Sequence, residues 1–293
     1  MKGRSAKSTP SNQHPKEIFM NINPLIYPVS VSCNLSCDYC FHRDKNRNDF
    51  SRIMGFDVFS KFMDDWIRLF PDEKKFEIVW HGGEPLLRGK DFYHEAVNLI
   101  SKYSNSNRKI VHCLQTNGLL IDKEWARLFK ENNFKIGISI DGPRELHDIF
   151  RKTKNQKGTF DKVIESILIL DEHNISFGIV IVVHNINVKY PDEIFKFMKE
   201  LGIKEIQISP CVEFGKKEKI FSVSPKEFAY FICRLYDLWL KEDNPDIAIG
   251  YIDDIVDTLL GDKCYNCLLS DECQNFLVLD WNGDIKPCED MFG

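Results

Sequence analysis

The sequence predicts an α/β fold, a partial (β/α)6 barrel of six βα units followed by a small cysteine-rich hairpin domain. Short β-rich runs alternate with helical stretches whose apolar residues recur at three- and four-residue spacing, which is typical of parallel βα units. Several of the runs, such as FGIVIVV and FEIVW, are almost continuously apolar, as expected for strands buried on both faces. Several also end in Gly, Pro, Asn, Asp or Ser, at the edge where parallel barrels carry their chemistry.

Each strand and helix is expected where its pattern begins and ends. The strands are expected at Leu25–Val31, Phe76–His81, Lys109–Gln115, Phe134–Ile140, Ser176–Val183 and Glu205–Ser209. The helices between them are expected at Phe56–Phe70, Asp91–Tyr103, Lys123–Glu131, Phe160–His173 and Pro191–Leu201. A further helix, Pro225–Trp239, is expected after Ser224, because Ser suits the N-cap and Pro suits the first helical position.

These elements divide the chain into three parts. Residues 1–20 are polar and are expected to form a disordered tail, residues 21–220 the barrel, and residues 221–293 a linker helix and the hairpin domain. In the last part, Asn282-Gly283 predicts a tight turn between strands at Phe276–Asp280 and Asp284–Pro287.

The composition excludes several classes of protein. Of the 293 residues, 43% are hydrophobic and 12% aromatic, enough to bury a full core, which excludes wholesale disorder. The net charge of −5 gives no global basic field that would hold nucleic acid or an anionic membrane. The apolar run at 177–183 is far shorter than the ~20 residues of a membrane-spanning helix. Because the N-terminal segment lacks the apolar core of a secretion signal, the chain is expected to be cytoplasmic.

The ten cysteines require an explanation by metal or redox chemistry, because thiols stay reduced in the cytoplasm. Cys33, Cys37 and Cys40 follow the first predicted strand with the spacing C-x3-C-x2-C. A structural zinc site normally takes four ligands, whereas three thiolates leave a cubane iron–sulfur cluster with one iron open to a small molecule. The spacing therefore favours an iron–sulfur cluster, with a structural zinc site or unrelated core cysteines as the alternatives.

Several motifs together resemble a known superfamily. The cysteine motif, which contains Tyr39, and Gly82-Gly83-Glu84-Pro85 at the end of the second strand resemble the radical S-adenosylmethionine (SAM) superfamily. The segments LQTNGLLID, GISIDGPRELHDIFRK and GTFDKV are similar to segments of the anaerobic sulfatase-maturating enzymes and related peptide-modifying maturases. This resemblance implies that Cys33, Cys37 and Cys40 hold a [4Fe–4S] cluster whose open iron binds the amino and carboxylate groups of SAM.

The resemblance also implies a set of SAM contacts, and the residue types suit them. The family positions that contact SAM are Tyr39, Gly83, Ser139, Arg151 and Val212. Gly82 and the glycine after it permit close backbone approach and unusual dihedral angles, and Arg151 can form a forked pair with a carboxylate. Glu84 can accept hydrogen bonds from an ammonium, and Asp141 suits ribose hydroxyls. The alternatives are an ordinary turn for the glycine pair and a surface ion pair for Arg151.

A second cysteine group lies in the last thirty residues. Cys267-x5-Cys273, a hairpin and then Cys288 are similar to part of the auxiliary-cluster (SPASM) domain of these enzymes, which is expected to be truncated here. Cys264 is expected as a substitute fourth ligand of an auxiliary [4Fe–4S] cluster, and a zinc ribbon is the alternative. Glu289 stands where the family has a catalytic Asp, so it is either the base that takes a proton from the substrate or a solvated surface residue.

Two departures from the family concern the substrate. His42 and His81 stand where the sulfatase-maturating members have Tyr and Gln near the substrate, so they are expected to contact the substrate or to be passive neighbours of it. The remaining Cys113, Cys211 and Cys233 are expected to pack as small hydrophobic residues.

The resemblance implies a radical SAM oxidoreductase that acts on a peptide or protein. An electron donor such as flavodoxin or ferredoxin would reduce the cluster, and cleavage of SAM would give a 5′-deoxyadenosyl radical that removes a hydrogen atom from a side chain. A Cys or Ser residue would become formylglycine, and the alternative is a maturase that oxidises or cross-links a ribosomally made precursor peptide. A third alternative is an iron–sulfur or zinc protein without catalysis. Neither nucleic acid nor a membrane is expected as a partner.

Overall fold

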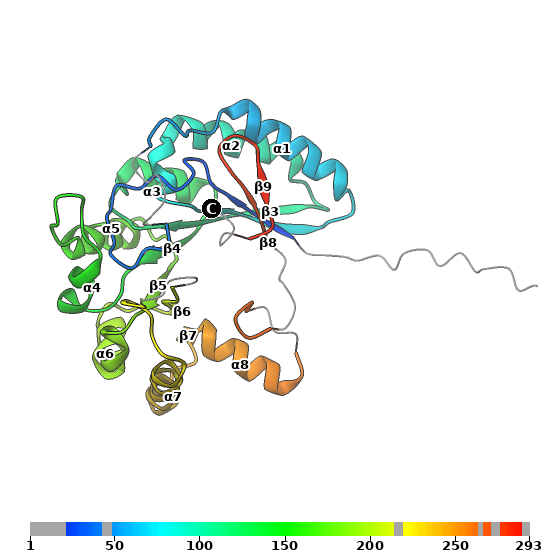
Figure 1. Cartoon of the computed structure of the whole chain (residues 1–293). Coiled ribbons are helices and arrows are strands. Elements are labelled where there is room, and N and C mark those ends of the chain that lie inside the picture. The colour runs from blue at the N-terminus through cyan, green and yellow to red at the C-terminus, as the bar shows by residue number, and fades with distance from the viewer. Residues whose placement is uncertain (1–21, 43–48, 214–218, 263–265, 271–275, 289–293) are drawn as a thin grey trace, which may run out of the picture.

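The structure, a computed structural model, describes residues 22–42, 49–213, 219–262, 266–270 and 276–288. Within these ranges, nine strands form one sheet in the order β7-β6-β5-β4-β3-β2-β1-β8-β9. Neighbouring strands are parallel except β8 and β9, and the outer strands β7 and β9 do not pair with each other among the described residues. The curved sheet therefore stays open, as a partial barrel does (Figure 1), which confirms the predicted fold class. The strands are β1 (Asn23–Ile26), β2 (Lys75–Trp80), β3 (Lys109–Thr116), β4 (Lys135–Ser139), β5 (Phe177–Val183), β6 (Glu205–Pro210), β7 (Ala248–Ile249), β8 (Phe276–Leu279) and β9 (Ile285–Lys286).

Helices connect the parallel strands and cover the outer side of the sheet (Figure 1). The alternation from β1 to α7 confirms the six predicted βα units. None of the helices in the described ranges is long and apolar enough to cross a membrane. The helices are α1 (Phe56–Leu69), α2 (Lys90–Tyr103), α3 (Lys123–Glu131), α4 (Arg144–Phe150), α5 (Phe160–Glu172), α6 (Pro191–Glu200), α7 (Pro225–Glu242) and α8 (Gly250–Leu260), with short 3-10 turns at Pro85–Arg88 and Asn187–Lys189.

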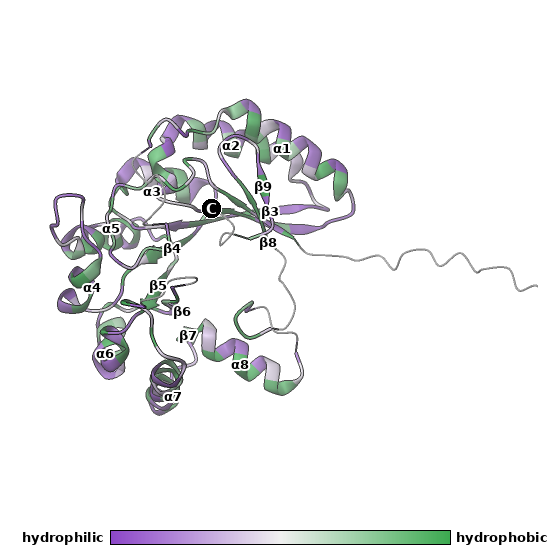
Figure 2. Cartoon of the chain, in the orientation of Figure 1, coloured by the Kyte–Doolittle hydropathy of each residue, from purple (hydrophilic) through white to green (hydrophobic). Residues whose placement is uncertain are grey.

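Two helices, α3 and α7, begin at side-chain caps. Ser224 caps α7 through a capping box with Glu227, which confirms the predicted N-cap. The Asp122 carboxylate accepts hydrogen bonds from the first backbone N–H groups of α3. The apolar sides of the helices face the sheet (Figure 2), and the large aromatic side chains of Trp80 and Phe92 are buried between β2, α1 and α2. This packing fixes the carboxyl ends of the strands, where the motifs lie.

The first strand is shorter than predicted. The expected strand Leu25–Val31 ends at Ile26, and the chain then turns, with N–H of Ser30 bonded to the carbonyl of Tyr27 (3.1 Å). Ser30 has a φ of 52°, whereas residues in β-strands have a negative φ. The prediction was wrong here because the apolar residues after Ile26 are buried in a turn, and burial alone does not distinguish a turn from a strand.

The predicted hairpin forms, and it lies at the edge of the barrel sheet. Gly283 has a φ of 91° in the turn, and the Asp280 N–H donates to the carbonyl of Asp284 (2.9 Å), which confirms the predicted turn. β8 pairs in parallel with β1 over four residues, so the hairpin extends the sheet of the barrel. The division at residue 220 stays a prediction, and the predicted tail at 1–20 lies outside the described residues.

Candidate active site at the carboxyl ends of the strands

The three motif cysteines lie on the loop that follows β1. Cys37 is buried, and Cys33 and Cys40 are half-buried. Burial raises the pKa of Cys33 to about 12, and the nearby charges of Glu84, Cys37 and Cys40 act in the same direction. Metal binding would have to displace the proton of the Cys33 thiol. This donor set fits an iron–sulfur cluster with three protein ligands.

A single metal ion would need a tighter arrangement. The described residues hold no group of three or more His, Cys, Asp or Glu side chains that could bind one ion. This finding concerns single-ion sites, because the thiolates around a four-iron cluster lie further apart than those around one zinc ion.

The side chain of Asn117 supports the cysteine loop. Its amide donates a hydrogen bond to Asn34 (2.8 Å) and lies 3.7 Å from the sulfur of Cys33.

The glycine pair after β2 packs directly on the cysteine loop. The N–H of Gly83 donates to the carbonyl of Ser30 (3.0 Å), and the N–H of Glu84 donates to the carbonyl of Ser32 (2.8 Å). A Cβ on Gly82 would lie 2.5 Å from the Ser30 oxygen, and one on Gly83 would lie 2.0 Å from the Ser32 oxygen. Gly82 also has a φ of 106°. The predicted close approach and unusual dihedral angle are therefore present, and the backbone that is approached belongs to the cysteine loop.

The Glu84 carboxylate is fully buried and bound by its own chain. It accepts hydrogen bonds from the N–H of Leu86 (3.1 Å), the hydroxyl of Thr116 (2.8 Å) and the N–H of Asn117 (2.8 Å). Burial raises its pKa to about 7, although these hydrogen bonds act in the opposite direction. A carboxylate has about four acceptor positions, so one remains for the ammonium that the sequence predicts as a partner. That contact stays a prediction.

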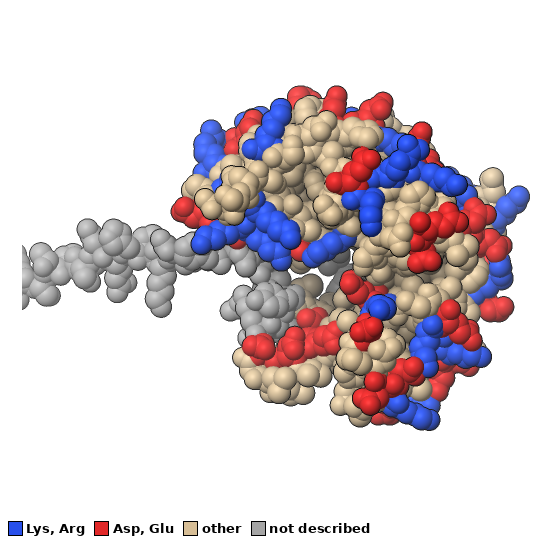
Figure 3. Space-filling view, turned by 180° about the vertical axis from the view of Figure 1, so that it is seen from behind, with Lys and Arg blue, Asp and Glu red and all other residues tan. Residues whose placement is uncertain are grey.

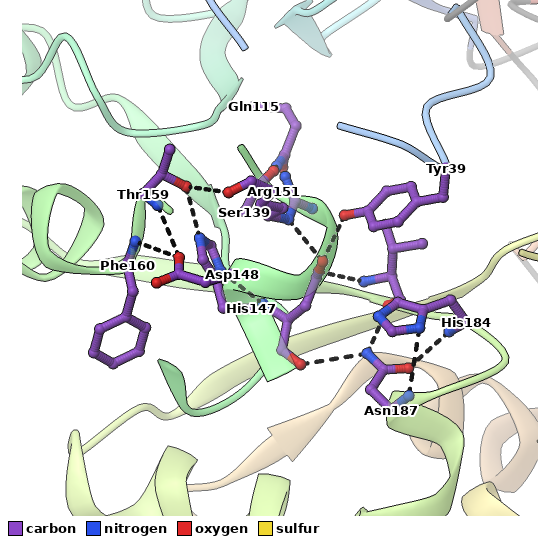
Figure 4. Close-up of polar contacts among 12 residues, drawn as sticks. Tyr39, Gln115, Ser139, His147, Asp148, Arg151, Thr159, Phe160, His184 and Asn187 are labelled. Atoms are coloured by element: carbon purple, nitrogen blue, oxygen red, sulfur yellow. Dashed lines mark hydrogen bonds and ion pairs between the residues drawn. The ribbon is translucent and has the colours of Figure 1, made fainter. Parts of the chain in front are cut away.

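Asp141 and Arg151 form a buried ion pair at the ends of β4 and α4 (Figure 4). Nε of Arg151 donates to Oδ2 of Asp141 (2.8 Å), and the hydroxyl of Tyr39 donates to the same oxygen (2.5 Å). Burial raises the pKa of Asp141, but Arg151 and these hydrogen bonds outweigh burial and hold that pKa below its usual range. The Val182 N–H occupies the other oxygen (3.0 Å). Asp141 therefore accepts three hydrogen bonds within the protein, and its contact with ribose stays a prediction.

The other predicted SAM residues lie along the same edge. The Ser139 hydroxyl, at the end of β4, accepts a hydrogen bond from the side-chain amide of Gln115 on β3 (2.9 Å). Val212 is half-buried just after β6. Arg151 has five N–H donors, of which the ion pair takes one, so its guanidinium can still bind a carboxylate. The SAM contacts of these residues stay predictions.

The two histidines predicted at the substrate both pack against Tyr27, a buried residue that sequence reasoning missed. The His81 ring is stacked on the Tyr27 ring with 5.8 Å between centroids, and the His42 ring meets it edge-on at 6.0 Å. His42 is buried and His81 is half-buried. Residues from two separate motifs are thus brought to one aromatic side chain.

Sequence reasoning also missed three histidine and threonine side chains around Asp141. His147, Thr159 and His184 are buried at this edge. Nδ1 of His147 accepts a hydrogen bond from the Asp141 N–H, and the His184 ring stacks on Tyr39 with 5.7 Å between centroids. His147 and Thr159 lie in the family-like segments at 137–152 and 158–163, so their presence there was the available signal.

The second cysteine group is only partly described. Cys267 is exposed and Cys288 is half-buried, whereas Cys264, Cys273 and Glu289 lie outside the described residues. The ligands of the auxiliary cluster and the catalytic base therefore stay predictions.

The three remaining cysteines differ in their surroundings. Cys211 is buried, as expected for a small hydrophobic residue. Cys113 is half-buried, and its thiol lies 3.5 Å from the Glu77 carboxylate. Cys233 is exposed on α7, so the expectation that it packs in the core was wrong.

A cavity of about 460 Å³ lies on the inner face of the sheet. Its wall includes Gln115 on β3, Gly137 on β4, Val180 on β5, Gln207 on β6 and Asp253 on α8. Seen from behind (Figure 3), the molecule is hollowed beside α8, where Asp and Glu side chains gather. The cavity reaches Gln115, the partner of Ser139, so it adjoins the predicted SAM residues.

Known proteins are similar to this chain in sequence and in fold. The profile described as the radical SAM superfamily matches residues 27–209. The cysteine-type anaerobic sulfatase-maturating enzyme of Clostridium novyi is 34% identical over 275 residues, which cover 92% of this chain and 74% of that enzyme. The serine-type enzyme of Bacteroides thetaiotaomicron is 34% identical over 285 residues, which cover 90% of this chain and 68% of that enzyme.

Solved structures agree with these matches. The structure of anSMEcpe with bound AdoMet and a Cp18Cys peptide superposes with a TM-score of 0.83 at 30% identity, covering 92% of this chain and 74% of that one. Streptococcus suis SuiB superposes with a TM-score of 0.66 at 18% identity, which shows a shared fold. The chain therefore belongs to the radical SAM superfamily, as an enzyme that uses a [4Fe–4S] cluster and SAM, and within it to the family of the anaerobic sulfatase-maturating enzymes.

Proposed function

We propose that the chain oxidises a cysteine or serine side chain of a peptide or protein to formylglycine. The observation that carries this proposal is that Gly82 and Gly83 bind the cysteine loop at the carboxyl end of β2, on the sheet edge where Ser139 and Arg151 lie. A cavity on the inner face of the sheet reaches Gln115, the partner of Ser139. Relatives named for both cysteine and serine substrates are equally similar, at 34% identity each. A related structure holds both AdoMet and a peptide.

The residues of this chain have distinct parts in the proposed reaction. Cys33, Cys37 and Cys40 would hold the cluster, and Arg151 would bind the carboxylate of SAM with the N–H groups that Asp141 leaves unused. When bound, the cluster and SAM supply a carbon-centred radical that can remove a hydrogen atom. The cavity that reaches Gln115, the partner of Ser139, would hold part of the substrate.

The oxidation removes two hydrogens from the substrate side chain, one from its β-carbon and one from its hydroxyl or thiol. The β-carbon would lose a hydrogen atom, after which the hydroxyl or thiol would lose a proton and the carbon radical an electron. Glu289 would take the proton, and an auxiliary cluster held by Cys264, Cys267, Cys273 and Cys288 would take the electron. Serine then gives the aldehyde directly, whereas cysteine gives a thioaldehyde that water hydrolyses with release of hydrogen sulfide. A small electron-transfer protein such as flavodoxin or ferredoxin would supply the electron that starts each turnover.

The test uses two peptides that differ only in Cys or Ser at one position. Each is incubated without oxygen with the reconstituted chain, dithionite and SAM, and is then examined by mass spectrometry. We expect the serine peptide to lose two hydrogens, and the cysteine peptide to lose two hydrogens and exchange sulfur for oxygen. Cys40→Ala should abolish both changes. Unchanged peptides, from protein shown to cleave SAM in a Cys40-dependent way, would contradict the proposed substrate.

A second candidate is a maturase that oxidises or cross-links a precursor peptide. His42 and His81 favour it, because they replace the Tyr and Gln of sulfatase-maturating members and meet at Tyr27. A cross-link would remove two hydrogens from a cysteine-containing precursor while retaining its sulfur. The same mass spectra therefore distinguish the two candidates.

A further inference from the structure

Four buried residues at the ends of β4, α4 and α5 form a closed ring of hydrogen bonds (Figure 4). The Asp141 N–H donates to Nδ1 of His147 (3.3 Å), and Nε2 of His147 lies 3.0 Å from the hydroxyl oxygen of Thr159. The Thr159 hydroxyl donates to the carbonyl of Arg151 (2.9 Å). Nε of Arg151 donates to the Asp141 carboxylate (2.8 Å), which closes the ring.

The ring allows one assignment of its hydrogens. Nδ1 of His147 accepts a backbone hydrogen bond, so in the neutral imidazole the hydrogen must be on Nε2. Nε2 therefore donates to Thr159, whose own hydroxyl hydrogen goes to Arg151. Burial lowers the pKa of His147 to about 4, which keeps the ring neutral near pH 7 and outweighs the opposite effect of Asp141. Each group in the ring thus donates or accepts in a fixed direction.

The ring holds Arg151 at both ends. Its backbone carbonyl accepts from Thr159, its backbone N–H donates to the carbonyl of His147 (3.1 Å), and its guanidinium is fixed by Asp141. Arg151 is also the residue that ends α4, so no further helical turn restrains it. Asp141 is itself tied to β5 through the Val182 N–H. The direction of the guanidinium therefore depends on the ring.

We infer that His147 and Thr159 are positioning residues that orient the Arg151 guanidinium toward the carboxylate of bound SAM. This inference rests on the proposed placement of Arg151 at the SAM carboxylate. It assigns a purpose to two segments, 137–152 and 158–163, that are distant from the cysteine motif in the sequence. A planar guanidinium recognises a carboxylate only in a narrow range of orientations, so a loosened ring should weaken that contact selectively.

The test compares SAM with decarboxylated SAM, which lacks the carboxylate. Equilibrium dialysis against the reconstituted chain with its cluster oxidised measures binding without cleavage. The readout is the preference for SAM, defined as the ratio of the two dissociation constants. Since hydrogen bonds to charged groups are among the stronger ones, we expect Arg151→Gln to lower this preference by about tenfold or more, and Thr159→Val by at least about threefold. Thr159→Ser, which keeps the hydroxyl, should restore it.

Ser166→Ala is the matched control. Its hydroxyl is also buried and bonds to backbone carbonyls, those of Gly118 (2.6 Å) and Lys162, but it is not part of the ring. The preference should be unchanged in this variant. The inference is overturned if Thr159→Val keeps the wild-type preference while Arg151→Gln loses it. If Arg151→Gln also keeps it, the placement of Arg151 is wrong, and peptide oxidation still tests the proposed function separately.

Discussion

At the scale of single residues, the contact between Gly83 and the cysteine loop leaves no room for a side chain. A Cβ on Gly83 would lie 2.0 Å from the backbone oxygen of Ser32, one residue before Cys33, the first cysteine of the motif. We therefore expect Gly83→Ala to displace the loop, to destabilise the fold by about 1–3 kcal/mol and to lower the iron bound per chain. Urea unfolding and iron analysis after reconstitution measure the two effects.

Gly202→Ala is the control for this substitution. Gly202 has a φ of 66°, and a Cβ there meets nothing within 4 Å. Its substitution should cost about 1–2 kcal/mol from backbone strain while leaving the iron content unchanged. Equal iron content in wild type and Gly83→Ala would show that the loop tolerates the displacement.

The sequence predicted which residues of the site matter better than it predicted their partners. Tyr39, Asp141 and Arg151 were identified from their motifs, and the structure brings them together. The sequence could not show that Asp141 binds Tyr39, because a hydrogen bond between residues 102 positions apart depends on how distant loops pack. The ring through His147 and Thr159 joins residues close in the sequence, but it depends on the chain turning back between Lys152 and Gly158, which no local pattern revealed.

At the scale of elements, the buried side chain of His112 on β3 contacts Trp80 on β2 and Phe134 just before β4. The indole N–H of Trp80 on β2 donates to Nδ1 of His112 (3.3 Å), and the His112 ring stacks on Phe134 with 4.5 Å between centroids. Burial lowers the pKa of His112 to about 4. His112 takes up a proton at a higher pH in the unfolded chain than in the folded chain. Its contribution to stability is therefore present above about pH 6.5 and is lost as the pH falls toward 4.

Replacing His112 should therefore reduce the acid sensitivity of the fold. A glutamine at this position can still accept from Trp80 but does not titrate. Wild type should lose free energy of unfolding between about pH 7.5 and about pH 5. We expect this loss to be roughly 2 kcal/mol smaller in His112→Gln. Urea unfolding at the two pH values measures this difference. His94→Gln, at an exposed position on α2, should leave the loss unchanged. A loss in His112→Gln as large as that of wild type would show that His112 does not cause the acid sensitivity.

The elements were predicted well where a local signal marked them. β5 and α3 agree with the prediction within one residue, because continuous apolar runs and capping residues are local signals. The elements α4, β7 and α8 were not predicted. The two residues of β7 are strand only because they pair with β6, which no local signal reveals.

At the scale of the whole molecule, the cysteine-rich hairpin and the barrel share one sheet. β8 lies beside β1, and the side chains of Val278 and Leu279 are almost completely buried. Leu279 belongs to the same apolar core as the strands and helices of the barrel. A segment that carries predicted auxiliary-cluster ligands is thereby fixed to the strand that leads into the cysteine loop.

This arrangement predicts that the hairpin and the barrel unfold together. Leu279→Ala removes buried apolar volume at the β1–β8 contact and should destabilise the whole fold by about 2–5 kcal/mol. Thermal unfolding should remain a single transition that shifts to lower temperature, because a cooperative unit loses its structure as a whole. Ile285→Ala on β9, where the side chain is 60% exposed, should shift it little. A separate transition that alone responds to Leu279→Ala would instead make the hairpin an independent domain, and its position beside β1 would then contribute nothing to the stability of the barrel.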